Sequence, residues 1–351
     1  MKKNSFIIFL LLLIFSCENM ETVVDLDVPE TPPVLVLNAM LDTDVPVTLL
    51  ISHSVGAFSQ ELPNCINDAE VLLYENNQFL DTLQVNLDSV INYYVYADGI
   101  WDSIPMNYYK SDLIPNKNTT YKVEASHPNY PSIVATTYIP EDLTVDYEVE
   151  LDTTGSPDEY IYNDNGTPDD DSDDFKEYNP SFNPNHGGLN GVELSFDDNP
   201  SQDNFYRLKI YSSCFKEWET EDGQIEIDYF RGYLQMMSND PSFESSLGSL
   251  IDGYSFTGDQ VVFDDALFNG QEKNIRLDID SYGWRYANCD TVRIQFSIFS
   301  ADTYSYYNSL NNHRQIGIFG GEVIPVYSNV ENGLGSFMSI NDQILQLKPI
   351  E

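Results

Sequence analysis

The segment from residue 292 to residue 298, Val-Arg-Ile-Gln-Phe-Ser-Ile, decides the fold class. Its apolar residues Val292, Ile294, Phe296 and Ile298 alternate with polar ones, which is the pattern of a β-strand that buries one face and wets the other. Three other segments share this alternation: 45–51, 225–229 and 275–280. The sequence therefore predicts an all-β protein built mainly from antiparallel sheets.

The segments between these strands are short and rich in turn-forming residues. The chain contains 18 prolines and 19 glycines, which mostly separate the apolar runs, as turns between short strands require. A short helix is expected at 303–314, where Tyr306, Tyr307 and Leu310 form a partial apolar face.

Two β domains are expected after the N-terminal segment. Residues 31–140 suit an immunoglobulin-like β-sandwich, with a late strand at 119–125, a closing strand at 133–139 and a boundary at Pro140. Residues 141–351 form a second, larger antiparallel β domain. An acidic stretch at about 152–190, with few apolar residues, is expected to be a long solvated loop inserted into that domain.

The charge balance excludes several partners. The 351 residues include 57 acidic and 16 basic ones, for a formal net charge of −41. Aromatic residues make up 13% of the chain, which distinguishes it from disordered acidic proteins. Binding to nucleic acid needs many Lys and Arg contacts with phosphates, so no nucleic-acid partner is expected. Electrostatic docking on an anionic membrane is excluded for the same reason.

The N-terminus predicts an exported lipoprotein. Lys2 and Lys3 precede an apolar run at 6–15, and a small residue, Ser16, precedes Cys17. This arrangement is typical of a signal peptide over residues 1–16. The segment 14–17 resembles a bacterial lipobox, so Cys17 is the predicted lipid attachment site, followed by an acidic tether at 17–30. The alternative is an ordinary secretory signal with an incidental cysteine.

Three cysteines follow the predicted lipidation site: Cys65, Cys214 and Cys289. An exported protein can keep disulfides, and three thiols allow one intramolecular bond. Cys214–Cys289 is the preferred pair because both residues adjoin strand-like segments of the same half. The alternative is that all three thiols are free and buried.

The acidic stretch holds a candidate calcium site. Residues 163–171 resemble the Asp-rich calcium loops of thrombospondin type 3 and EF-hand-like repeats, with oxygen ligands around a glycine turn at Gly166. The pattern departs from those loops at Ile161 and Ser172, and the alternative is a solvated acidic loop without metal. The candidate ligands are Asn163, Asp164, Asn165, Asp169 and Asp171.

Clustered aromatic residues in the first domain suggest a contact surface, because aromatic rings on loops bind partner proteins or stack on sugars. The alternative is that these rings fill the core of the sandwich. The candidates are Tyr93, Tyr94, Tyr96, Trp101, Tyr108 and Tyr109.

No motif predicts catalysis. The sequence lacks a GxSxG elbow, an HExxH pair and a phosphate-binding glycine loop, and its four histidines are far apart. We therefore expect no enzymatic activity, no catalytic residue and no cofactor other than calcium.

The order of several short motifs carries a family resemblance. After the lipobox cysteine come Val-Asp-Leu-Asp-Val-Pro-Glu at 24–30, Val-Leu-Val-Leu-Asn-Ala at 34–39 and Asn-Asp-Ala-Glu-Val-Leu-Leu-Tyr at 67–74. The second half has Phe-Asp-Asp-Asn-Pro at 196–200, Phe-Asp-Asp at 263–265, Phe-Asn-Gly at 268–270 and Gly-Leu-Gly-Ser-Phe at 333–337. This series resembles a family of uncharacterised outer-membrane lipoproteins of Bacteroidota, catalogued as a domain of unknown function and often encoded beside TonB-dependent receptors.

The resemblance implies a location and a partner. We expect a lipid-anchored accessory protein of the outer membrane, held in the bilayer through acylated Cys17 and placed on the cell surface rather than on the periplasmic face. Its expected partner is an outer-membrane β-barrel of the TonB-dependent receptor type, which it would help to capture or take up substrate. The alternatives are a structural subunit of a barrel-assembly or secretion machine, and a surface glycan hydrolase.

Overall fold

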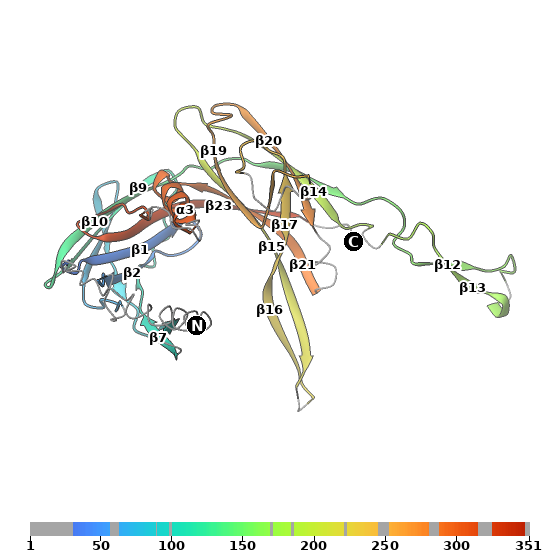
Figure 1. Cartoon of the computed structure of the whole chain (residues 1–351), viewed down its shortest axis with the longest axis horizontal. Coiled ribbons are helices and arrows are strands. Elements are labelled where there is room, and N and C mark those ends of the chain that lie inside the picture. The colour runs from blue at the N-terminus through green and yellow to red at the C-terminus, as the bar shows by residue number, and fades with distance from the viewer. Residues whose placement is uncertain are drawn as a thin grey trace, which may run out of the picture.

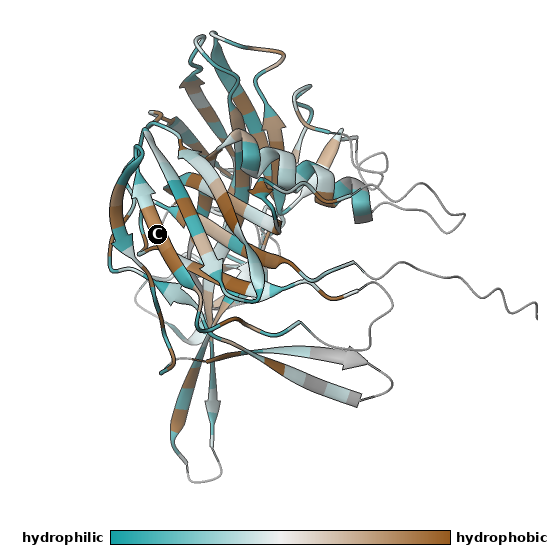
Figure 2. Ribbon diagram, turned by 90° about the vertical axis from the view of Figure 1, so that its left-hand side faces the viewer, coloured by the Kyte–Doolittle hydropathy of each residue, from teal (hydrophilic) through white to brown (hydrophobic). Residues whose placement is uncertain are grey.

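The computed structural model describes residues 31–56, 63–88, 90–97, 100–168, 171–183, 186–220, 223–244, 253–280, 288–314 and 325–347. Together these residues form one nine-stranded sheet, two five-stranded sheets and two two-stranded sheets. An all-β fold is therefore confirmed (Figure 1). The alternation of apolar and polar residues along the strands is visible as alternating colours in Figure 2.

The first β-sandwich packs one end of the nine-stranded sheet against a five-stranded sheet. Leu37, Ile51, Val71 and Val123 belong to its core and are fully buried. From the large sheet come β1 (Leu35–Asp42), β2 (Thr48–His53), β5 (Gln84–Val85) and β8 (Tyr109–Lys110). Facing them are β3 (Glu70–Glu75), β4 (Gln78–Thr82), β9 (Thr119–His127), β10 (Tyr130–Ile139) and β22 (Val330–Glu331).

The second sandwich packs the other end of the nine-stranded sheet against the second five-stranded sheet. Val192, Leu208, Leu277 and Ile294 are fully or almost fully buried between them. The large sheet contributes β15 (Phe205–Glu219), β16 (Ile225–Tyr233), β19 (Gln260–Asp264) and β21 (Asn288–Phe299). Facing them are β11 (Asp146–Leu151), β14 (Leu189–Asp197), β17 (Gln235–Ser238), β18 (Phe256–Gly258) and β20 (Glu272–Asp280).

The last strand, β23 (Leu334–Leu347), belongs to both sandwiches. Its first half runs parallel to β1, from Val36 opposite Leu334 to Asp42 opposite Ile340. Its second half runs antiparallel to β21. Phe337 accordingly lies in the first core, whereas Leu345 and Leu347 lie in the second. The expected boundary at residue 140 therefore separates the cores incompletely, because β22 and β23 return to the first sandwich.

A glycine makes the parallel contact between β1 and β23 feasible. Gly335 has φ +101°, and a Cβ atom at this position would lie 2.0 Å from the carbonyl oxygen of Leu37. Only glycine tolerates both the conformation and the close approach. The Gly-Leu-Gly-Ser-Phe motif thus has a structural role, which is to let the C-terminal strand join the N-terminal one.

The expected short helix is present as α3 (Ala301–Arg314). Ser300 caps its N-terminus, since the Ser300 Oγ accepts a hydrogen bond of 3.1 Å from the backbone N–H of Thr303. The Thr303 hydroxyl in turn donates to the carbonyl oxygen of Ser339 in β23, at 2.8 Å. Within the described ranges, no helix has the length and apolar character needed to cross a membrane.

Three β-hairpins extend away from the sandwiches (Figure 1). They are formed by β6 (Ile91–Ala97) with β7 (Ile100–Met106), by β12 (Tyr160–Asn163) with β13 (Phe175–Tyr178), and by the ends of β15 and β16. The second hairpin, with a 3₁₀ turn at Asp171–Asp173, lies within the stretch 152–190 that was expected to be a long solvated loop. That expectation was wrong because two short aromatic segments flank the acidic run and pair with each other.

Candidate functional site

Exposed aromatic side chains are concentrated on the three hairpins. In the described residues, nine tyrosine and tryptophan side chains are exposed, and eight of them lie on these hairpins. The ninth, Tyr147, lies on β11 of the second sandwich. The eight are Tyr93, Tyr94, Trp101, Tyr160, Tyr162, Tyr178, Trp218 and Tyr229. Large rings kept in water at projecting positions are typical of protein-binding surfaces.

The β6–β7 hairpin carries most of the aromatic surface predicted from the sequence. Tyr93, Tyr94 and Trp101 are 59%, 65% and 69% exposed. Directly opposite residues of an antiparallel pair share a face. Tyr93 is opposite Ile104, which is buried, whereas Tyr94 is opposite Ser103 on the other face of the hairpin. The hairpin therefore presents aromatic rings on both faces.

Two predicted members of this surface belong elsewhere. Tyr109 is 2% exposed, and its prediction as a surface residue was wrong. The Tyr109 hydroxyl accepts a hydrogen bond from the N–H of Ala69 and donates one to the carbonyl of Ile66, both at 2.9 Å, so burial leaves no polar atom unpaired. Tyr108 is half-buried. The side chain of Tyr96 lies outside the described residues.

An apolar groove of about 470 Å³ lies beside the β6–β7 hairpin. Tyr93, Ile104 and Met106 form its hairpin side, and Leu50 and Leu334 are among the residues of the large sheet that line it. A free cysteine, Cys65, also lines the groove. A groove of this composition suits an apolar side chain or a hydrophobic small molecule.

The predicted calcium loop connects β12 with η1. The side-chain oxygen of Asn163 accepts a hydrogen bond from the N–H of Asn165 at 2.9 Å. That of Asp164 accepts one from the N–H of Gly166 at 3.0 Å. Two of the predicted ligand oxygens thus stabilise the turn itself, with Asn165 and Gly166 at positive φ.

Beyond this turn, the structure describes one further predicted ligand. Asp171 lies exposed in η1, and Asp169 is outside the described residues. Asp173 instead accepts hydrogen bonds from Thr167 at 2.7 Å and from the side-chain amide of Asn165 at 3.1 Å. Where the chain is described, no group of three or more His, Cys, Asp or Glu side chains could hold a metal ion. Calcium binding therefore stays a prediction.

The exposed rings of the β12–β13 and β15–β16 hairpins were not predicted from the sequence, and the β15–β16 hairpin also exposes an apolar row. Ile225, Ile227 and Tyr229 alternate with acidic residues, as strands of a sandwich do, but they are 70%, 46% and 80% exposed. Figure 2 shows this hairpin at the bottom of the view, with hydrophobic bands beyond the body of the protein. The alternation alone does not show whether another layer covers the apolar face.

The predicted disulfide lies at the base of this hairpin. Cys214 is buried and disulfide-bonded. The register of β15 with β21 sets Cys214 directly opposite Cys289. The side chain of Cys289 is outside the described residues, so the pairing of these two cysteines stays a prediction. The predicted lipid attachment site, Cys17, is also outside the described part of the chain.

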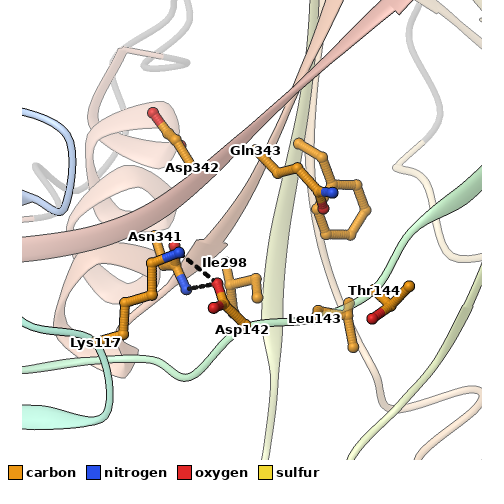
Figure 3. Close-up of a pocket in the computed structure, with 9 residues that line it drawn as sticks. Lys117, Asp142, Leu143, Thr144, Ile298, Asn341, Asp342 and Gln343 are labelled. Carbon is orange, nitrogen blue, oxygen red and sulfur yellow. Dashed lines mark hydrogen bonds and ion pairs between the residues drawn. The ribbon is translucent and has the colours of Figure 1, made fainter.

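Two polar clefts lie where the chain passes from the first sandwich to the second. They flank residues 142–144 and have volumes of about 330 Å³ and 290 Å³. In the larger one, Lys117 Nζ lies 2.6 Å from the carboxylate of Asp142, and the amide of Asn341 donates to the same oxygen at 3.3 Å (Figure 3). The hydrogen bond from Lys117 lowers the pKa of Asp142.

Asn341 also binds the backbone of the segment that joins the two sandwiches. Its side-chain amide donates to the carbonyl oxygens of Pro140 and Glu141 at 3.3 Å and 3.0 Å. Asp342 points away from this cluster in Figure 3. These contacts therefore hold β23 against the segment that joins the two sandwiches. The polar residues of the larger cleft thus have a structural role in this connection.

The second aspartate of each Phe-Asp-Asp motif, Asp198 or Asp265, has a structural role. Asp198 accepts hydrogen bonds from the hydroxyl of Tyr206 at 2.5 Å and from the N–H of Gly270 at 2.8 Å. Asp265 accepts one from the N–H of Asn204 at 2.9 Å, and burial raises its pKa. Both carboxylates are buried and hold neighbouring turns together. These bonds explain the motif without a catalytic role.

A family model described as "Domain of unknown function (DUF4249)" matches residues 21–344 of the chain. No curated protein and no solved structure matches the chain significantly.

Proposed function

The chain belongs to the family described as Domain of unknown function (DUF4249), and from this premise we propose that it is a non-enzymatic accessory lipoprotein of the outer membrane. In this proposal, acylated Cys17 anchors it to the bilayer on the cell surface. The protein binds a barrel of the TonB-dependent receptor type and helps it to capture or take up its substrate.

The observation that carries the proposal is the concentration of exposed rings on three projecting hairpins. Tyrosine and tryptophan are among the residue types enriched in the hot spots of protein interfaces. Tyr229 and Trp101, at 80% and 69% exposed, are the extreme cases in the described residues of β16 and β7. Exposed apolar residues that are gathered in this way, rather than scattered singly, mark surfaces that bind other proteins.

The negative charge of the chain supports the proposal that a lipid anchor and a protein partner hold it at the membrane. With a formal net charge of −41, the protein is repelled by an anionic membrane surface. Several acyl chains on one cysteine hold a protein stably, since each buried CH₂ contributes about 0.8 kcal/mol. In this proposal the lipid anchor attaches the protein to the membrane, and the hairpins determine which protein it binds.

Affinity purification in mild detergent tests the proposal. The native chain should recover a large β-barrel protein. A triple variant, Trp101→Ser, Tyr162→Ser and Tyr229→Ser, should lose it, with one ring removed from each hairpin. Phe79→Ser is the matched control, because Phe79 is a 59% exposed ring on β4 of the first sandwich. Recovery of the lipoprotein alone from native cells would contradict the proposal.

Deletion of the gene separates the uptake role from its alternative. A growth defect limited to particular nutrients would support a role in uptake. General failure of the envelope would instead assign the protein to a barrel-assembly or secretion machine. Protease treatment of intact cells tests the proposed surface location, since a periplasmic protein would resist cleavage.

A further inference from the structure

The strand β16 is an open edge of the nine-stranded sheet. It is the terminal strand in the sheet order and pairs with β15, from Tyr211 opposite Tyr233 to Glu219 opposite Ile225. Among the described residues, no strand pairs with its other edge. The residues from Ile225 to Arg231 are all exposed. A long open edge carries a row of backbone N–H and C=O groups that can pair with a further strand.

The two faces of β16 differ in chemistry. Ile225, Ile227 and Tyr229 share one face. Glu226 and Asp228 share the other, where Asp228 is opposite Lys216 of β15. Glu226 accepts an exposed hydrogen bond of 3.1 Å from the indole N–H of Trp218. The strand thus offers an apolar row on one side and an acidic row on the other.

We propose that the outer edge of β16 binds, as an added strand, an extended segment of a partner protein in which apolar and basic residues alternate. Directly opposite residues of paired strands have Cβ atoms about 4.5–5.5 Å apart. Every second residue of the segment would pack on Ile225, Ile227 and Tyr229. The residues between them would lie opposite Glu226 and Asp228, where lysine or arginine is favoured.

Charge decides against a second copy of this chain as the occupant. An antiparallel pair of β16 strands centred on Ile227 would place Glu226 of one copy opposite Asp228 of the other. Like charges directly opposite each other destabilise a pair of strands, and each copy also carries a formal net charge of −41. The inference deepens the proposed function, on which it rests for the existence of a partner protein, by naming the segment that is recognised.

A synthetic peptide tests strand addition without the barrel. The probe is a labelled nine-residue peptide with isoleucine or tyrosine at odd positions and lysine at even positions. Its control has the same composition, with the apolar residues and the lysines in two separate blocks. In fluorescence anisotropy with the full chain, the alternating peptide should bind about tenfold more tightly or better. Its binding should also protect the amides of residues 225–231 from hydrogen exchange.

A charge swap on the acidic face identifies the site. The double variant Glu226→Lys and Asp228→Lys should bind the lysine peptide at least about tenfold more weakly, and it should bind a peptide with glutamate in place of lysine. Glu217→Lys with Glu219→Lys is the matched control. It changes the net charge equally but lies on β15, opposite Ile227 and Ile225 on the other face of the hairpin. Circular dichroism checks that both variants fold.

Each other outcome overturns the inference. Equal binding of the alternating and block peptides, equal effects of the two double variants, or unchanged exchange in β16 would each exclude strand addition at this edge. Dimerisation of the native chain that the Glu226→Lys and Asp228→Lys variant abolishes would assign the edge to a second copy. If the peptide does not bind but the barrel still co-purifies, the inference about β16 fails and the proposed function stands. If the peptide binds but no barrel co-purifies, the proposed function fails and the strand-binding edge stands.

Discussion

Replacement of Gly335 by alanine should push β23, the strand shared by the two sandwiches, away from its parallel partner β1. An alanine Cβ would lie 2.0 Å from the carbonyl oxygen of Leu37, at a residue with φ +101°. Close contacts between carbon and a carbonyl oxygen are about 3.3 Å or longer. The backbones of β1 and β23 would have to move apart by more than about 1 Å, because no side chain can rotate away.

The size of the effect follows from two costs. A positive φ costs a non-glycine residue about 1–2 kcal/mol. Moving the strands apart weakens buried backbone hydrogen bonds, and each one lost costs about 1–3 kcal/mol. We expect the variant to lose about 3–5 kcal/mol of the free energy of unfolding, which is a large fraction of the stability of a domain.

Gly166→Ala is the matched control for this substitution. Gly166 has φ +77°, but nothing lies within 4 Å of a Cβ at that position. Its substitution should therefore cost only about 1–2 kcal/mol, through the conformational term alone. Urea unfolding of both variants, followed by circular dichroism, gives the comparison. Equal losses in the two variants would refute the assigned contact between β1 and β23.

Three further outcomes are expected. Tyr109→Phe removes a buried hydroxyl and leaves two partners unpaired, so urea unfolding should show a loss of about 1–3 kcal/mol; an unchanged midpoint would contradict the hydrogen bonds assigned to it. Reduction with dithiothreitol should destabilise the native chain by about 4 kcal/mol if Cys214 pairs with Cys289, and should leave Cys214→Ser unaffected. Burial raises the pKa of three tyrosines to about 12, whereas an unfolded tyrosine titrates near 10, so the unfolded state loses protons first. The free energy of unfolding should therefore fall between about pH 10 and pH 12, more steeply than in a variant with phenylalanine at these positions, and equal slopes would count against the assigned burial. These tyrosines are Tyr121, Tyr304 and Tyr327.

The local part of the fold could be predicted from the sequence because it depends on the two-residue period of strands. The alternation at 292–298 corresponds to β21, and that at 275–280 to β20. The division of β23 between two sandwiches could not be predicted in this way. Its parallel partner, β1, lies almost 300 residues earlier in the chain, and no local pattern carries such a distant register.

The exposure of the candidate site residues could not be predicted from local sequence either. Tyr94 and Tyr109 belong to one aromatic cluster in the sequence, yet one is 65% exposed and the other 2%. Ile227 on β16 and Ile294 on β21 likewise occur in matching alternations, but only Ile294 is buried. What separates the members of each pair is whether another layer covers the strand, and that is a property of the tertiary arrangement.

Site-specific crosslinking in intact cells tests the central claim most directly. A photoreactive amino acid would replace Trp101, Tyr162 or Tyr229, one on each hairpin, with Phe79 of the first sandwich as the control position. We predict a crosslink from each hairpin to a large outer-membrane β-barrel and none from position 79. Crosslinks from position 79 alone, or no barrel at any hairpin position, would contradict it.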